Sequence, residues 1–525
     1  MKSIFSTNGI IFIINNIQKN LLKCFLLITI FFVTIYKITL IGDGFLAFPD
    51  EFRYAQSGSM LKNLSEKDIK SSIINIFSAQ GRPGDVLIKT IPNSVQFVTA
   101  KIFGLSYYER NNSFPLFIFN YLVYIGILVL TYRLGYHILK NNILTLFSVL
   151  TYGLFTNSYI YIRHALPYDA SLFICLFVIY KLIVSIDDVK MTFSKLLCLG
   201  FCSFFGYLVY PGYIPLYIIS LIILFYKFRL NNLRIILSQL LFYSLGSIAC
   251  LSLFELLSRF GGSSYINSAL HLSTTVTQGS FEESFVFFIK YLIAVENLSG
   301  IILLISLVLF YSSLIKYFVM KDIENNSLIL VLGTSILGLY LLYASTGYYL
   351  SKVVFYGRLI HQYLPFLCIF MAVSLNNTFN NSRIKYGFLL IISIVGIYNF
   401  IISIEYYKSY SYPRDVSWNL IKEYPNAKIN TIFEYENSWS VMPKPTNFKP
   451  IQNEESNQIY LINCCYFYPI NNLEKYHEFK PNSNLKYYKS YNHFLNFKAY
   501  QYEGYSIQER EYLDRLSFKI KVFYE

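Results

Sequence analysis

Charged residues are scarce in this sequence. Asp, Glu, Lys and Arg make up 14% of its 525 residues, whereas 54% are hydrophobic. Soluble globular domains carry roughly a quarter of their residues as charge. A chain with so little charge has too much apolar surface for a water-facing fold, so much of that surface must lie against lipid. The scarcity of charge therefore excludes an ordinary soluble protein and predicts an integral membrane protein.

Two motifs are also missing. No small-residue cleavage site follows the first apolar run, which predicts a retained anchor and not a signal peptide. No Asp-x-Asp element occurs, the element with which soluble nucleotide-sugar transferases hold a divalent ion. Glu51, His164, His271 and His361 could meet as a zinc site, but their spacing does not indicate one. We predict no metal and no cofactor.

Long apolar runs recur along the chain. A helix of about twenty residues, rising roughly 1.5 Å per residue, crosses a hydrocarbon core of about 30 Å. About eleven transmembrane helices are predicted, at residues 21–41, 114–132, 142–161, 169–186, 196–210, 212–227, 235–257, 298–318, 327–344, 361–376 and 386–404. Residues 1–404 are therefore predicted to form an all-α polytopic membrane domain.

The net charge of +14 does not indicate nucleic-acid binding, because the positive residues form no stripe. They stand in alternate gaps between apolar runs, as expected of Lys and Arg in cytoplasmic loops. The positive gaps hold Lys19 and Lys23, Arg133 and Lys140, Lys190 and Lys195, Lys227, Arg229 and Arg234, Lys316 and Lys321, and Arg383 with Lys385. The alternation predicts a cytoplasmic amino terminus and, after an odd number of spans, a carboxyl terminus outside the plasma (inner) membrane.

Two regions are too polar to cross a membrane. Residues 42–113 form a large first outer loop, in which Val86–Phe103 has apolar residues at helical spacing broken by polar ones. That pattern predicts helices lying in the membrane interface. After residue 404 the apolar runs shorten, and Gln458–Ile462 and Phe518–Phe523 predict short strands. Residues 405–525 are predicted to be a small soluble α/β or mostly β domain on the outer face.

Acidic residues are few outside the C-terminal region, so their positions are informative. Asp50 and Glu51 follow the outer end of the first span and precede Arg53 and Tyr54. One interpretation is a helix start, with Asp50 as N-cap after Pro49 and Glu51 in solvent. The other is a catalytic carboxylate held at the membrane surface.

Two more polar clusters stand at predicted outer span ends. The first runs from Arg163 to Asp169; as a simple turn, Pro167 would start a helix and Asp169 would favour its positive end. The second begins at Arg358 and contains Tyr363; Arg358 could merely snorkel to the interface. All three clusters fall on one predicted face of the membrane, where they suit one reaction. A carboxylate could accept a proton from an attacking hydroxyl while arginines hold a phosphate leaving group.

The order of these pieces resembles the integral-membrane GT-C glycosyltransferases, in the branch of protein O-mannosyltransferases and the lipid A aminoarabinose transferase. Their Asp-Glu pair plus Tyr in the first outer loop is similar to Asp50–Tyr54. Their basic residue before Pro and their interfacial helix ending in Phe-Gly resemble Arg82-Pro83-Gly84 and Lys101-Ile102-Phe103-Gly104. Their Arg-x-x-x-Pro-Asp and late Arg-Tyr-Leu-Leu-Pro elements resemble Arg163–Asp169 and Arg358–Pro365.

The resemblance covers roughly residues 20–376. Two positions depart from the family pattern: Gly84 replaces a second Pro, and Tyr168 separates Pro167 from Asp169. The resemblance implies a GT-C-like fold and an inverting transfer of a sugar from a polyprenyl-phosphate donor. The acceptor would be a hydroxyl or phosphate of a cell-envelope lipid, glycan or protein on the outer face.

The resemblance also implies roles for single residues. Asp50 would be the general base or the carboxylate that orients the acceptor, with Glu51 in support. The candidate substrate-binding residues are Arg53, Tyr54, Arg82, Arg163, Asp169, Arg358 and Tyr363. The implied partners are the lipid-linked donor, an unidentified envelope acceptor and the bilayer.

Two other classes of protein would use outer arginines. A flippase for a lipid-linked sugar or polysaccharide would grip a sugar phosphate, but it should carry charges deep in its spans, where this chain has almost none. A surface-polymer polymerase or ligase would usually lack the Asp-Glu pair in the first loop. The sequence therefore favours a surface reaction over transport.

Overall fold

The computed structural model is a bundle of helices with two smaller parts at one end. It describes residues 7–42, 48–78, 81–105, 113–187, 191–227, 233–275, 281–320, 323–352, 355–424, 428–431, 458–462 and 486–524. The bundle helices are α1 (Thr7–Tyr36), α5 (Phe114–Leu139), α6 (Asn142–Leu154), α7 (Tyr168–Val184), α8 (Phe193–Val209), α9 (Ile214–Lys227), α10 (Leu233–Phe260), α13 (Asn297–Met320), α14 (Ile323–Leu350), α16 (Leu364–Thr378) and α17 (Ser382–Ser409). Short connecting elements are η1 (Lys37–Leu40), η6 (Ser185–Asp187), η7 (Pro211–Tyr213), α11 (Tyr265–Thr275), α12 (Phe287–Val295) and α15 (Gly357–His361).

Six stretches of the described chain are helical, long and apolar enough to cross a membrane. They are Gln18–Leu40, Phe114–Leu139, Arg234–Phe260, Asn297–Lys316, Ser327–Leu350 and Ser382–Ser409. They confirm an all-α polytopic architecture. The other predicted spans fall on α6, α7, α8, α9 and α16, which have 13, 17, 17, 14 and 15 residues. Helices of that length cover roughly 20–26 Å, so eleven full spans remain a prediction.

The predicted span 142–161 is broken. Helix α6 ends at Leu154, and the chain turns by 84° into two 3-10 turns, η4 (Thr156–Ser158) and η5 (Ile160–Arg163). Non-helical backbone inside an apolar bundle needs partners for its amides. The buried carboxylate of Glu296 accepts from the backbone N–H of Thr156 at 2.8 Å and of Asn157 at 2.9 Å. Hydropathy predicted a continuous span because it does not register this distant carboxylate.

The first loop folds as η2 (Pro49–Glu51), α2 (Phe52–Ser65), α3 (Ile69–Phe77) and α4 (Pro83–Phe103). Helix α4 starts at a proline and ends at Gly104, whose left-handed φ of 62° caps it. One face of α4 is exposed and apolar, and it is formed by Ile91, Val95, Val98, Ile102 and Phe103. The opposite face is polar and buried, and it is formed by Asp85, Lys89, Asn93 and Gln96. This inverted polarity suits a helix that turns its apolar face to lipid and its polar face to a site.

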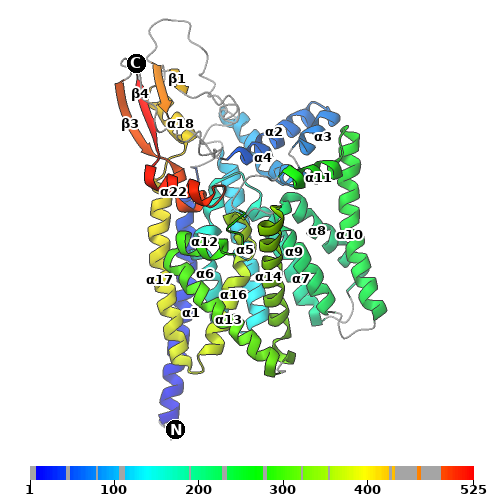
Figure 1. The fold of residues 1–525 in the computed structure, drawn as a ribbon, viewed down its shortest axis with the longest axis vertical. Helices are drawn as coiled ribbons and strands as arrows, with labels where there is room; N and C mark the ends of the chain where they lie inside the picture. Colours follow the sequence, from blue (N-terminus) through cyan, green and yellow to red (C-terminus); the bar gives the residue numbers. More distant parts are fainter. Residues whose placement is uncertain are drawn as a thin grey trace.

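The C-terminal region is mixed α/β. Its elements are α18 (Pro413–Glu423), β1 (Lys428–Thr431), β2 (Gln458–Ile462), β3 (Lys486–Asn492), η8 (Phe494–Asn496), α21 (Lys498–Gln501), α22 (Ile507–Leu516) and β4 (Lys519–Tyr524). The sheet order is β1-β2-β4-β3, with β1 and β2 parallel and the other pairs antiparallel. Both predicted strands are confirmed, as β2 and β4. Figure 1 shows this sheet and helices α2–α4 at the same end of the bundle, opposite the amino terminus.

Candidate functional site

Asp50 lies in η2 among three guanidinium groups. Its Oδ2 is 2.9 Å from Nη1 of Arg82, 3.1 Å from Nη2 of Arg53 and 3.8 Å from Nη1 of Arg358. The Asp50 side chain is 35% exposed, so this arrangement opens to the surface. We call Asp50, Arg53, Arg82 and Arg358 the arginine cluster. The helix-cap interpretation of Asp50 is wrong, because its carboxylate bonds to guanidinium groups and α2 begins without a side-chain cap.

Elements far apart in sequence bring the arginine cluster together. Arg53 stands in the first turn of α2, Arg82 directly before α4, and Arg358 in α15. Asp85 anchors Arg53 through an Oδ2 to Nε distance of 2.9 Å and also accepts from Lys89 at 2.8 Å. Because Asp85 is shared, the cluster keeps an excess of positive charge around Asp50.

Tyrosine side chains contact the guanidinium groups of the arginine cluster. The guanidinium of Arg82 lies 5.2 Å from the ring of Tyr210, and that of Arg358 lies 4.1 Å from the ring of Tyr356. Arg358 also donates a hydrogen bond to the hydroxyl of Tyr168. The rings of Tyr168 and Tyr210 are 4.7 Å apart. Cation–aromatic contacts of this kind hold guanidinium groups in place without neutralising them.

Both departures from the family pattern have a structural reason. A Cβ at position 84 would lie 2.7 Å from the backbone nitrogen of Val209, so the close contact of α4 with α8 requires Gly84. Tyr168, the inserted residue, is the one that reaches Arg358. Asp169 does not join the arginine cluster, and its Oδ1 lies 3.3 Å from Nε2 of His361.

The C-terminal region contributes a carboxylate to the site. Glu503 is 5% exposed, accepts a hydrogen bond from the hydroxyl of Tyr161 at 2.7 Å, and has Oε2 3.6 Å from Nε of Arg358. A backbone hydrogen bond also holds the segments of Arg358 and Glu503 together, since the N–H of Gly357 donates to the carbonyl of Tyr502 at 3.0 Å. Sequence reasoning missed Glu503, because a single acidic residue in a polar tail carries no signal. Tyr168 and Asp85 were also missed; each stands within or beside a motif that the sequence singled out.

The electrostatics of Asp50 follow from its neighbours. Partial burial raises the pKa of the Asp50 carboxyl, but the guanidinium groups of Arg53, Arg82 and Arg358 lower it by more. The net pKa lies well below its usual value, so Asp50 is ionised at neutral pH.

Glu51 faces the opposite way and is completely buried. Its carboxylate accepts from the backbone N–H of Phe48 at 3.1 Å and of Ala165 at 3.0 Å, and its Oε1 lies 2.9 Å from Nδ1 of His164. Nε2 of His164 lies 2.6 Å from the hydroxyl of Tyr500 in the C-terminal region. Glu51 therefore links the first loop to the residues after η5, and through His164 to the C-terminal region.

Four predicted site residues do not join the arginine cluster. Arg163 is buried and donates to the backbone carbonyls of Leu40 and Tyr407 at 3.3 and 3.2 Å. Tyr54 is buried and donates to Gln96. The remaining two, Asp169 and Tyr363, are buried in the bundle. The structure thus gathers Asp50, Arg53, Arg82 and Arg358, whereas Glu51 contacts other residues.

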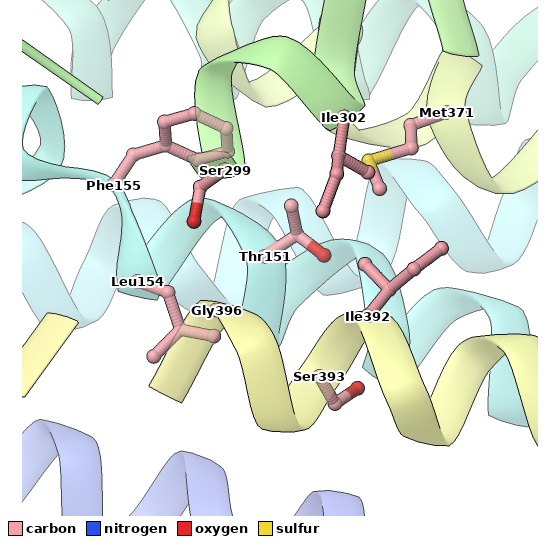
Figure 2. Close-up of a pocket in the computed structure, with 9 residues that line it drawn as sticks. All are labelled: Thr151, Leu154, Phe155, Ser299, Ile302, Met371, Ile392, Ser393 and Gly396. Atoms are coloured by element: carbon pink, nitrogen blue, oxygen red, sulfur yellow. The ribbon is translucent and has the colours of Figure 1, made fainter. Parts of the chain in front are cut away.

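A small cavity lies inside the bundle, away from this site. Figure 2 shows it between α6, α13, α16 and α17, with the hydroxyls of Thr151, Ser299 and Ser393 among apolar side chains. Its volume is about 20 Å³, roughly the space of one water molecule. It is too small for a sugar or a lipid chain. Within the described residues, no three His, Cys, Asp or Glu side chains are placed to hold a metal ion.

The arginine cluster can therefore bind an anion beside an ionised carboxylate, at the end of an apolar bundle. Comparisons with protein-family models, with curated proteins and with solved structures give no match to this chain.

Proposed function

We propose that the protein transfers a sugar from a polyprenyl-phosphate donor to a hydroxyl acceptor, with inversion at the anomeric carbon. The observation that carries the proposal is the arginine cluster: three guanidinium groups around one partly exposed carboxylate. A donor of this class has one phosphate between its sugar and its lipid. Guanidinium forks match phosphate oxygens, and Nε of Arg358 is a buried donor without a hydrogen-bond partner among the described residues.

In this mechanism Arg82 and Arg358 bind the donor phosphate. Their positive charge is then shared with the phosphate, so the carboxylate of Asp50 becomes more basic than in the empty site. Asp50 accepts the proton of the acceptor hydroxyl as its oxygen attacks the anomeric carbon. The bond from that carbon to the phosphate oxygen breaks, and the arginines stabilise the charge of the departing polyprenyl phosphate.

The surroundings suit a lipid-linked donor. The exposed apolar face of α4 contains Ile91, Val95 and Val98, which are 58%, 50% and 53% exposed. A prenyl chain would leave the cluster into the lipid that this face contacts. The site would lie on the outer face of the plasma membrane, with the amino terminus in the cytoplasm, as the loop charges predict.

The test is transfer of a radiolabelled sugar from a polyprenyl-phosphate donor by the purified protein, with identification of the labelled product. Transfer should persist with chelators present and should not need a nucleotide sugar. Strict dependence on a nucleotide sugar would contradict the proposal.

A flippase would move labelled donor across vesicles without forming product, and this assay separates it from the transferase. The buried ionisable groups of the bundle give transport little support. Lys37 donates to the hydroxyl of Tyr124 at 2.7 Å and to the carbonyl of Gly153 at 2.5 Å, and Glu296 holds the η4 turn. Both act as buried structural partners, and neither lines the small cavity of Figure 2.

A further inference from the structure

The C-terminal region inserts one ionisable group into the arginine cluster. Four cationic groups, Arg53, Arg82, Lys89 and Arg358, face three carboxyl groups, Asp50, Asp85 and Glu503. The net charge of these seven groups is therefore +1 when Glu503 is ionised and +2 when Glu503 is neutral. Of the three carboxyl groups, Asp50 and Asp85 form ion pairs of 2.8–3.1 Å with at least two cations each. Among the cations of the described residues, Glu503 approaches Arg358 alone, to 3.6 Å.

The side chains of Glu503 and Arg358 form an ion pair at 3.6 Å without a side-chain hydrogen bond. The Nε of Arg358 is buried and has no hydrogen-bond partner in the part of the chain that the structure describes. The approach is nevertheless built into the fold, because a Cβ at position 357 would lie 2.7 Å from Oε1 of Glu503. The donor group thus stays available to a ligand while a carboxyl group sits beside it.

The surroundings of Glu503 favour its neutral form. Burial raises the pKa of the Glu503 carboxyl to about 7, against the opposing effect of Arg358. The charged groups that act on it are Arg358 and Asp50. The titratable groups that face it are the hydroxyls of Tyr161, Tyr210, Tyr213 and Tyr291. A phosphate bound to Arg358 would neutralise part of the guanidinium charge. The attraction between Arg358 and ionised Glu503, which is the main interaction that stabilises the ionised form, would then weaken.

We infer that binding of a lipid phosphate at the arginine cluster is coupled to protonation of Glu503. Ionised Glu503 is the counter-charge of Arg358 in the empty site, and it takes up one proton from solvent when the phosphate replaces it. Glu503 is therefore a positioning and charge-setting residue that the tail supplies. The inference rests on the proposed function only for the identity of the anion.

The experiment measures binding to the purified full-length protein, with methyl farnesyl phosphate as the probe. This phosphodiester keeps one negative charge over the neutral range, so any proton taken up comes to the protein. Calorimetry in buffers of different ionisation enthalpy measures proton uptake, and a titration over pH measures affinity. Above about pH 7 the wild type should take up close to one proton, and its affinity should fall by up to about tenfold per pH unit.

Glu503→Gln keeps an acceptor for Tyr161 but cannot ionise. It should bind the probe without proton uptake and with an affinity that does not change with pH. Glu509→Gln is the matched control: it removes one charge from the same region, and glutamine can keep the capping box with Ser506. It should behave as the wild type.

Three results would overturn the inference: a pH-independent wild type, a Glu503→Gln variant that retains the wild-type pH dependence, or a folded protein that does not bind the probe. If coupling is found but no sugar is transferred, the proposed function fails and the inference stands.

Discussion

Two adjacent carboxylates, Asp50 and Glu51, have opposite surroundings. Asp50 is 35% exposed and contacts three guanidinium groups, and no backbone amide of the described residues is among its partners. Glu51 is completely buried, and backbone amides and a histidine occupy its oxygens. The difference shows how to tell a reacting carboxylate from a structural one. A carboxylate held by side-chain cations can exchange partners with a ligand, whereas a carboxylate held by backbone amides stabilises the fold.

The largest effect is expected for Asp50→Asn. Asparagine keeps the shape but cannot accept a proton, so turnover should fall by at least about a hundredfold. The KM for the donor should not rise, because the arginines no longer pair with a carboxylate that competes with the donor phosphate. Kinetics of the purified variant measure both. Asp68→Asn is the control, since Asp68 caps α3 in the same loop and asparagine caps about as well. Wild-type turnover in Asp50→Asn would refute the general-base role.

Arg358→Lys should have the next largest effect. An ammonium keeps the charge but cannot reproduce the guanidinium fork or its contact with the ring of Tyr356. We expect the KM for the donor to rise about tenfold, which corresponds to roughly 1.4 kcal/mol. Arg515→Lys, at a side chain that is 79% exposed, is the control. An unchanged KM would mean that Arg358 does not contact the phosphate.

Glu51→Gln should act on stability more than on chemistry. The amide of glutamine would place N–H groups against the backbone N–H of Phe48 or Ala165, leaving a buried donor unpaired. We expect a loss of about 1–3 kcal/mol in the free energy of unfolding. Thermal unfolding in detergent checks this loss. Turnover per folded molecule should fall less than in Asp50→Asn. A larger fall would mean that Glu51, and not Asp50, is the reacting carboxylate.

The sequence predicted the parts of the molecule that have local signals. Hydropathy predicted a helix at each expected span, although the one at 142–161 breaks after Leu154, and the mixed pattern of Val86–Phe103 predicted helix α4. The motifs singled out Asp50, Arg82 and Arg358, which the structure brings together. The helices could be predicted because each depends on residues that are neighbours in sequence.

The remaining features depend on distant partners. The break after α6 needs Glu296, and the counter-charge of Arg358 comes from Glu503 in the tail. Arg163 stood in a motif, yet backbone carbonyls of two distant segments bind it away from the cluster. No pattern in the sequence near these residues specifies which group they meet.

Phosphate binding at the arginine cluster is tested most directly by a cryo-electron microscopy structure of the protein with methyl farnesyl phosphate bound. We expect phosphate density within about 3 Å of guanidinium nitrogens of Arg82 and Arg358, with the prenyl chain leaving along α4. Asp50 should remain beside the phosphate. Phosphate density at Arg163, or at the opposite end of the bundle, would show that the arginine cluster is not the phosphate site.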